Sequence, residues 1–252
     1  MTGKDPFYIG YAARPTAEIK RFMRRVVALL VGTAVVLAVV LTSLQRPFAS
    51  SFFEFGHVRE FEGVIQAGPY ALLLVTRPGR TDQNESLSRY PLVAFGKKGA
   101  SEIGSKFGGQ HIGLRGSLIY RDGQTMVEVV EGSVHPIQSA EPGRPASHSV
   151  GVQSLVGEIV DSKCFLGVMN PGNLKTHKAC AIRCISGGIP PFFVVRDASN
   201  HVAYYLLVSK EGLPVNMQVL DKIAEPLRIV GEVFVEGQMR ILKADPMGFE
   251  RL

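Results

Sequence analysis

The chain has 252 residues, which suits one or two domains, and 46% of them are hydrophobic, so it can bury a sizeable core. Its formal net charge of +6 would suit an anionic partner. However, residues 1–25 hold six basic and two acidic side chains, and the rest of the chain holds 22 basic and 20 acidic ones. A nucleic-acid-binding protein carries its basic patch on its folded part. The charge distribution therefore argues against nucleic acid as a partner.

Residues 26–44, VVALLVGTAVVLAVVLTSL, contain no charged side chain. A helix of this length is about long enough to cross the hydrocarbon core of a bilayer, which is roughly 30 Å thick. The basic segment KRFMRR precedes the run, whereas only Arg46 follows it closely. The positive-inside rule then predicts a cytoplasmic tail at residues 1–25 and a periplasmic remainder, in the inner membrane of a bacterium. A cleaved signal peptide is the alternative, but the polar lead and the long apolar run favour a permanent anchor.

Five segments after the anchor are rich in β-branched and aromatic residues and are bounded by Gly or Pro, which predicts β-strands. They are REFEGVI, YALLLVT, YPLVAFG, QHIGLRGSLIYRDG and QTMVEVVEG. The segment KKGASEIGSKFGG, between the third and fourth strands, is the helix that we expect in this half. These elements make up a first domain at residues 56–137.

The same order of elements repeats in the second half of the chain. Residues 138–154, QSAEPGRPASHSVGVQS, have the small, polar and Pro-containing composition of a linker. Residues 155–252 then contain five predicted strands, SLVGEIVD, PPFFVVRD, VAYYLLV, PLRIVGEVFVEG and QMRILKA. Between the third and fourth, VNMQVLDKIA has apolar residues at helical spacing and predicts a helix.

Five short strands with a helix between the third and fourth form the element order of an OB-type barrel. We therefore predict a mainly β protein, in which a single N-terminal transmembrane helix is followed by two tandem OB-like β-barrels. A pair of small β-sandwiches is the structural alternative.

The repeat shows where the second half has gained a segment. Gly63 and Gly116 in the first half match Gly157 and Gly231 in the second, at spacings of 53 and 74 positions. The excess lies between the first and second predicted strands, where the second half contains DSKCFLGVMNPGNLKTHKACAIRCISGG. We interpret this stretch as a helical insertion in the second barrel. Loops that carry such additions often hold functional sites.

The insertion contains every cysteine of the chain and one histidine. They are Cys164, His177, Cys180 and Cys184. The part NLKTHKACAIRCISGG predicts a helix with Asn173 as its N-cap. The histidine and the last two cysteines share one stripe of this helix, while Cys164 follows a strand and can approach either helical cysteine.

One interpretation of these residues is a disulfide in an oxidising compartment. All three cysteines are candidates, and an odd count leaves at least one sulfur outside any intramolecular bond. A disulfide between Cys164 and Cys180 closes a loop of about 15 residues, worth about 3 kcal/mol in the chain-entropy model. It would fix the inserted helix to the barrel.

The other interpretation is a metal site, because three cysteines and one histidine are an accepted zinc ligand set. His177 and Cys184, however, would be about 10 Å apart along an unbroken helix. One ion could then take Cys164 with Cys180 and either Cys184 or His177. Plain reduced cysteines are a third possibility. A catalytic thiol is not expected, because no third partner for a Cys–His pair is identifiable and a thiol inside a helix lacks the N-terminal dipole.

Two resemblances accompany these patterns. The order VGEIVDSKC, H..C, RCI.GG and PFFVV resembles small secreted bacterial OB-like domains of unknown function with a DSxC…HxxCxxxC signature. The resemblance covers residues 155–243 and implies an extracytoplasmic β-domain, but it implies no particular reaction.

The pattern H-x-x-x-Y at His201 and Tyr205 resembles the haem-attachment motif of the membrane-anchored OB-fold haem chaperones of cytochrome c maturation. In that family the motif lies near the end of a single barrel, whereas here it falls in a predicted hairpin.

Together these features predict a non-enzymatic accessory or assembly subunit anchored in the bilayer, for example in a membrane redox complex. Its partner would be another membrane or periplasmic protein, and no cofactor is expected. The alternative is a metal- or haem-handling or redox protein that uses the Cys/His cluster, with zinc, another transition metal or haem as cofactor.

Overall fold

The computed structural model describes residues 15–44, 51–76, 87–138, 147–197 and 201–252. The chain divides into two units, Met1–Phe48 and Ala49–Leu252. Each unit is described by itself.

The first unit contains one long helix, α1 (Ala17–Leu44), which begins nine residues before the predicted span. It is long and apolar enough to cross a membrane, and none of its residues is buried within the protein. The hydroxyl groups of Thr42 and Ser43 donate to helix carbonyls four residues back, at 2.7 and 2.8 Å. Internal bonds of this kind satisfy polar groups where no water is available. Residues 1–14 of the predicted basic tail lie outside the described residues.

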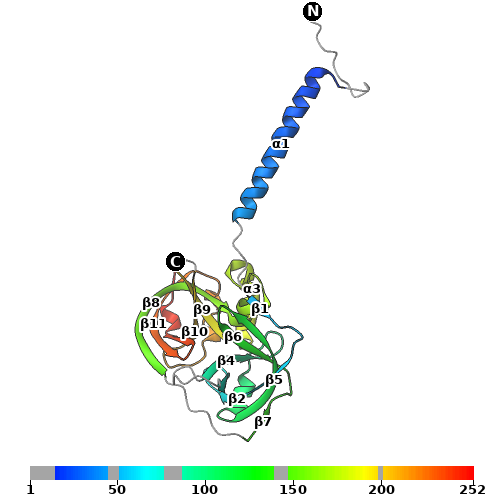
Figure 1. Cartoon of the computed structure of the whole chain (residues 1–252). Helices are drawn as coiled ribbons and strands as arrows, with labels where there is room; N and C mark the ends of the chain where they lie inside the picture. The colour runs from blue at the N-terminus through cyan, green and yellow to red at the C-terminus, as the bar shows by residue number, and fades with distance from the viewer. Residues whose placement is uncertain (1–14, 45–50, 77–86, 139–146, 198–200) are drawn as a thin grey trace, which may run out of the picture. The chain divides into compact units, whose positions relative to one another are not determined.

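The second unit begins with a five-stranded barrel (Figure 1). Its strands are β2 (Arg59–Gln66), β3 (Leu72–Thr76), β4 (Leu87–Val93), β5 (His111–Arg121) and β6 (Gln124–Val129). Strand β2 pairs with β3 and β5, β3 pairs with β4, and β4 runs parallel to β6. Pairing of β5 with β6 closes the barrel. Two short strands, β1 (Ser51–Phe53) and β7 (His135–Pro136), extend it through β5, and α2 (Ser101–Phe107) precedes β5 as predicted.

A second barrel repeats this topology. Its strands are β8 (Ser147–Asp161), β9 (Pro191–Arg196), β10 (Val202–Val208), β11 (Leu227–Glu236) and β12 (Met239–Ala244). Strand β8 pairs with β9 and β11, β10 runs parallel to β12, and pairing of β11 with β12 closes the barrel. A short turn, η4 (Pro246–Gly248), leads to β13 (Glu250–Arg251), which pairs with β11. The predicted tandem OB-like barrels are therefore confirmed, and the β-sandwich alternative is wrong because each sheet closes on itself.

The matching glycines occupy equivalent positions in the two barrels. Gly116 pairs with the residue four positions before Gly63, and Gly231 pairs with the residue four positions before Gly157. A Cβ atom at Gly63 or at Gly157 would collide with a carbonyl oxygen of the next strand. A close approach of two backbones is a common reason for glycine inside a strand, so the repeat has a steric cause.

Two segments differ from the predictions. Residues 147–154, expected in the linker, form the first half of β8, and residues 139–146 lie outside the described residues. The helix expected at residues 215–223 is instead two 3-10 turns, η2 (Asn216–Gln218) and η3 (Leu220–Lys222). The apolar residues of this segment have helical spacing, but its contacts with distant residues determine the backbone conformation. The Val215 amide donates to the Tyr70 hydroxyl at 3.2 Å, and the Asn216 side-chain amide donates to the carbonyl oxygens of Ile185, at the end of the inserted helix, and of Ile189, just after it.

The two barrels pack against each other through a common core. Buried residues of both barrels form one cluster, which includes Leu72, Val93, Ile119, Met126, Val160, Phe192, Leu206 and Ile241. Polar contacts also cross the interface. Arg89 forms an ion pair with Glu236, and the Tyr204 hydroxyl donates to Asp122 at 2.7 Å. The two barrels thus form one packed unit and are not independent domains joined by a linker.

Candidate functional site: a cluster of three thiols

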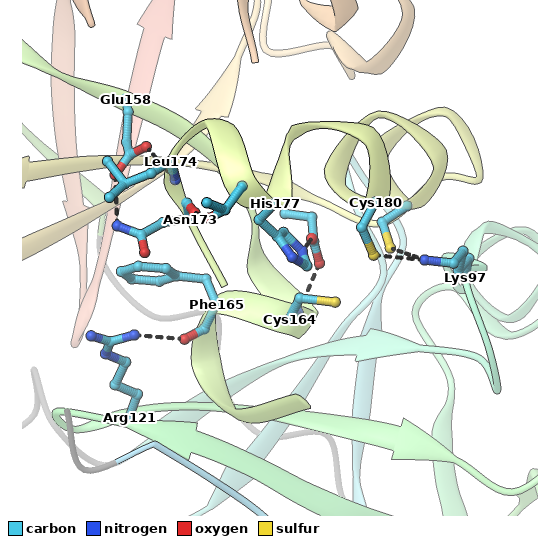
Figure 2. Close-up of polar contacts among 12 residues, drawn as sticks. Lys97, Arg121, Glu158, Cys164, Phe165, Asn173, Leu174, His177 and Cys180 are labelled. Carbon is cyan, nitrogen blue, oxygen red and sulfur yellow. Dashed lines mark hydrogen bonds and ion pairs between the residues drawn. The ribbon is translucent and has the colours of Figure 1, made fainter. Parts of the chain in front are cut away.

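The insertion between β8 and β9 forms a π-helical turn, η1 (Cys164–Val168), and the helix α3 (Leu174–Ser186). Asn173 occupies the predicted N-cap position of α3, but its side chain makes no capping hydrogen bond. Glu158 supplies the capping carboxylate instead. It accepts the Leu174 amide at 3.1 Å and the Asn173 side-chain amide at 2.9 Å (Figure 2). A carboxylate is favourable there because a helix N-terminus carries a partial positive charge.

The three sulfur atoms come together at one end of the insertion. The Sγ atoms of Cys164, Cys180 and Cys184 all lie within 4.8 Å of one another. Cys164 and Cys184 are buried, and Cys180 is partly exposed. All three are free thiols in the structure, so the predicted disulfide is not confirmed. Of the predicted ligand sets, Cys164 with the two helical cysteines is therefore the one that the fold assembles.

His177 belongs to a different group on the same helix. Its Nε2 atom lies 2.9 Å from Asp161 Oδ2, and the other carboxylate oxygen of Asp161 accepts the Cys164 amide at 2.7 Å. Asp161, Cys164 and His177 are all buried, and their candidate ligand atoms also lie within 4.8 Å of one another. The Asp161 carboxylate thus connects the start of η1 to α3 and fixes where the Cys164 sulfur lies.

A lysine from the first barrel reaches the cluster. The Nζ atom of Lys97 lies 2.7 Å from Cys180 Sγ and 3.7 Å from Cys184 Sγ. Lys97 lies in the loop after β4, and Figure 2 shows its side chain directed at Cys180. The site is therefore built by both barrels: the first supplies a cation and the second supplies the three thiols.

The loop that carries Lys97 is held against the insertion by a second lysine. Lys163 is buried beside Cys164, and its Nζ atom donates to the carbonyl oxygens of Ala94 and Gly96 at 2.9 and 2.7 Å. It also forms an ion pair with Glu128.

Backbone contacts complete this junction. The Gly99 amide donates to the Gly187 carbonyl at 2.9 Å. A Cβ atom at Gly187 would collide with the Lys97 carbonyl oxygen. Only glycine at this position lets the two loops approach so closely.

Contacts within the cluster shift the pKa values of Cys164, Cys184 and Lys97. A hydrogen bond from the Cys164 thiol lowers the pKa of Cys184 to about 7, against the opposing effect of burial, and the positive charge of Lys97 assists. That same bond, with burial and the nearby Asp161 charge, raises the pKa of Cys164. The hydrogen bond to Cys180 raises the pKa of Lys97. Near neutral pH a substantial fraction of Cys184 is therefore thiolate, while Cys164 stays protonated and Lys97 stays charged.

The structure does not bring His201 and Tyr205 into one site. The His201 side chain is 84% exposed and its Nδ1 atom lies 3.1 Å from Asp197 Oδ2. Tyr205 is buried in the core of the second barrel. Four residues of extended chain separate the two by about 13 Å. The pair therefore offers no common haem site.

Three contributors escaped the sequence analysis: Lys97, Asp161 and Lys163. Asp161 and Lys163 lie in the motif DSKC, so their nearness to Cys164 was available as a signal. Lys97 lies 83 residues before Cys180. Only the packing of the two barrels brings it to the thiols.

Comparisons with known proteins add little. No family model matches the chain, and the search of curated proteins returns no match. Among solved structures, the chain is similar to a deletion mutant of the single-stranded DNA binding protein from Thermus aquaticus, with 11% sequence identity and a TM-score of 0.21. The match covers 81% of this chain and 89% of that one. A TM-score this low gives no information about function.

Proposed function

We propose that this protein is a membrane-anchored, metal-handling protein that binds a soft metal ion, Cu(I) in particular, through Cys164, Cys180 and Cys184. The observation that carries the proposal is the convergence of the three sulfur atoms within 4.8 Å of one another. Sulfur atoms about 2.3 Å from one ion lie about 4 Å apart. The thiols therefore need to move only slightly to share an ion.

The donor set favours Cu(I) over zinc. Thiolates are soft ligands that select Cu(I), zinc and iron–sulfur clusters. Structural zinc sites are almost always four-coordinate. Among the described residues, no fourth cysteine, histidine or carboxylate oxygen joins the three sulfur atoms within the same distance. Three thiolates suffice for Cu(I), so a three-sulfur site fits this ion without an additional ligand.

The surrounding charges support binding of a thiolate-bound ion. Metal ligation requires deprotonated cysteines, and the lowered pKa of Cys184 supplies one thiolate near neutral pH. A cuprous ion with three thiolates carries two negative charges, and the Lys97 ammonium group offsets one of them. Burial of Cys164 and Cys184 shields the ion from solvent.

The anchor suggests the setting. We infer from the basic flank of α1 that the N-terminus is cytoplasmic and that both barrels lie in the periplasm of a bacterium. There the protein would act as an accessory or assembly subunit that passes its ion to a membrane or periplasmic redox protein. A reporter enzyme that is active only outside the cytoplasm, fused after Leu252, should be active. Activity of a cytoplasm-dependent reporter at the same place would contradict this orientation.

The proposal is tested by titrating the reduced full-length protein with Cu(I), in detergent and without oxygen, against a chromogenic Cu(I) chelator. We expect one ion per chain and loss of tight binding in each of three variants, Cys164→Ser, Cys180→Ser and Cys184→Ser. Ser186→Ala, on the same helix but outside the cluster, is the matched control and should bind as the parent does. Equal binding by the parent and by a variant with all three cysteines replaced would refute the proposal. A parallel titration with zinc tests the ion preference.

A further inference from the structure

The hydrogen bond between Lys97 and Cys180 is shorter than an ordinary hydrogen bond to sulfur. Charged N–H donors lie about 2.7–2.9 Å from oxygen acceptors, and sulfur is a larger atom than oxygen. The Lys97 Nζ atom is nonetheless only 2.7 Å from Cys180 Sγ, while its distance to Cys184 Sγ is an ordinary 3.7 Å. A nitrogen atom and a sulfur atom that are both bonded to one oxygen atom would lie about this far apart. The observed separation fits a nitrogen–oxygen–sulfur linkage.

From this geometry we propose that Lys97 and Cys180 form an oxygen-bridged covalent cross-link, Nζ–O–Sγ, when the protein meets peroxide. The site would be a redox-dependent modification that joins the first barrel to the second. It does not depend on the proposed metal site. If that site also exists, the cross-link removes one of its three thiolates and so blocks metal binding under oxidising conditions.

The two partners have the access and the fixed placement that such chemistry needs. Cys180 is the one partly exposed cysteine of the three, and Lys97 is exposed, so a small oxidant can reach both. The backbone on both sides of Lys97 is fixed by contacts with the second barrel. Lys163 holds the carbonyl oxygen of Gly96, and the Gly99 amide bonds to Gly187, so that the loop is fixed on both sides of Lys97.

The chemistry balances with hydrogen peroxide as the oxidant. The Cys180 thiol attacks one peroxide oxygen, the O–O bond breaks, a sulfenic acid forms and water leaves, which oxidises sulfur by two electrons. A second peroxide then oxidises the pair of sulfenic acid and Lys97 amine by two further electrons. The N–O bond forms and two more waters leave. In total one thiol, one amine and two peroxides give one N–O–S bridge and three waters.

The competing fate of the sulfenic acid is a disulfide. Cys164 and Cys184 both lie within 4.8 Å of Cys180 Sγ, and a sulfenic acid condenses readily with a thiol. In the structure, however, the lysine nitrogen lies 2.7 Å from the Cys180 sulfur across the barrel interface. The proposal therefore requires that the amine competes successfully with two neighbouring thiols.

The test uses the metal-free full-length protein in detergent, reduced and then treated with hydrogen peroxide, followed by digestion and mass spectrometry. We expect a cross-linked peptide that contains Lys97 and Cys180, heavier than the two separate peptides by one oxygen atom less two hydrogen atoms. It should disappear after treatment with a thiol reductant. It should also be missing in Lys97→Arg and in Cys180→Ser, and present in Lys98→Arg, which changes the adjacent lysine and serves as the matched control.

Other products would overturn the proposal. These are a disulfide from Cys180 to Cys164 or Cys184, or a sulfinic acid at Cys180 with Lys97 unmodified. Because the cross-link is sought without metal, its absence would leave the Cu(I) titration unaffected. Loss of Cu(I) binding would likewise leave the cross-link result unaffected. A circular dichroism spectrum of Lys97→Arg that matches the parent would show that a missing cross-link does not reflect misfolding.

Discussion

Asp161 and His177 form a buried pair in which the carboxylate oxygen Oδ2 and the ring nitrogen Nε2 lie 2.9 Å apart. The other oxygen of Asp161 holds the backbone amide of Cys164. One carboxylate thereby ties the π-helical turn to α3 and sets the distance from Cys164 to the two cysteines on the helix. Asp161 and His177 are therefore positioning residues for the thiol cluster.

Replacing Asp161 should weaken both the fold and the site. Asp161→Ala leaves the Cys164 amide and the His177 ring without a buried partner, and hydrogen bonds to a charged group are worth about 1.5–3 kcal/mol each. We expect denaturant unfolding to show a loss of about 3 kcal/mol, together with weaker Cu(I) binding.

An exposed pair with the same contacts provides the control for this prediction. Asp197 accepts the His201 amide at 2.8 Å and lies 3.1 Å from its ring, but both side chains face solvent. Asp197→Ala should cost less than about 1 kcal/mol. Equal losses in the two variants would contradict the role given to Asp161.

The Cys184 thiol should titrate at an unusually low pH. The pKa of Cys184 is lowered to about 7, below the ordinary value of about 8.5. Thiolate absorbance of the metal-free protein should therefore rise with a first midpoint near pH 7, because the charged form is the one that Cys164 and Lys97 stabilise. Cys184→Ser should abolish this step, and Cys164→Ala, which removes the hydrogen-bond donor, should move it to higher pH. A parent curve that begins only above pH 8 would be inconsistent with the hydrogen bond from Cys164.

The ion pair between Arg89 and Glu236 should hold the barrels together. The Arg89 side chain is only 4% exposed, and although burial lowers its pKa to about 10, it remains charged at neutral pH. Breaking a buried pair by removing one partner costs about 3–5 kcal/mol. Arg89→Leu should show such a loss in thermal or denaturant unfolding, whereas the double variant Arg89→Leu/Glu236→Leu should recover much of it.

The control for this prediction is the exposed pair of Arg228 and Glu250, 2.8 Å apart. Arg228→Leu should change stability by less than about 1 kcal/mol. If the double variant is no more stable than Arg89→Leu alone, the unpaired charge of Glu236 is not the source of the loss.

The junction between the barrels should not tolerate a methyl group. Gly187→Ala places a Cβ atom against the Lys97 carbonyl oxygen, and overpacking of this kind costs about 1–3 kcal/mol. We expect lower stability and a smaller yield of the cross-link, because the loop that carries Lys97 is pushed away from α3. Gly248→Ala is the control, since nothing lies within 4 Å of a Cβ atom there. Unchanged stability in Gly187→Ala would show that the loops separate without cost.

Local patterns were sufficient to predict most of the fold. The long apolar run predicted α1, and the strands of both barrels follow β-branched and aromatic segments bounded by turns. The glycine match at Gly63 and Gly157 was predictable because a close backbone approach imposes glycine on both copies. The helical prediction at residues 215–223 failed for the opposite reason. The apolar spacing there is real, and Val215, Val219 and Ile223 are fully buried, but contacts with distant residues decide the backbone.

The sequence indicated the cysteines of the candidate site but not the charged residues around them. The spacing of Cys180 and Cys184 on a helix, with Cys164 after a strand, indicated that Cys164 can approach either helical cysteine. It left open whether they form a disulfide or a metal site, and it argued against one ion shared by His177 and Cys184. The two lysines could not be assigned, because Lys97 reaches the thiols only after the barrels have packed. Asp161 was overlooked because an acidic residue at a strand end has many ordinary roles.

The proposed three-sulfur metal site is tested most directly by X-ray absorption at the copper edge of the full-length protein loaded with Cu(I). We expect a spectrum of a three-coordinate cuprous ion whose nearest neighbours are all sulfur, and a drop to fewer sulfur neighbours in Cys180→Ser. A nearest shell of nitrogen and oxygen atoms, or a parent spectrum that Cys180→Ser leaves unchanged, would contradict a site made of Cys164, Cys180 and Cys184.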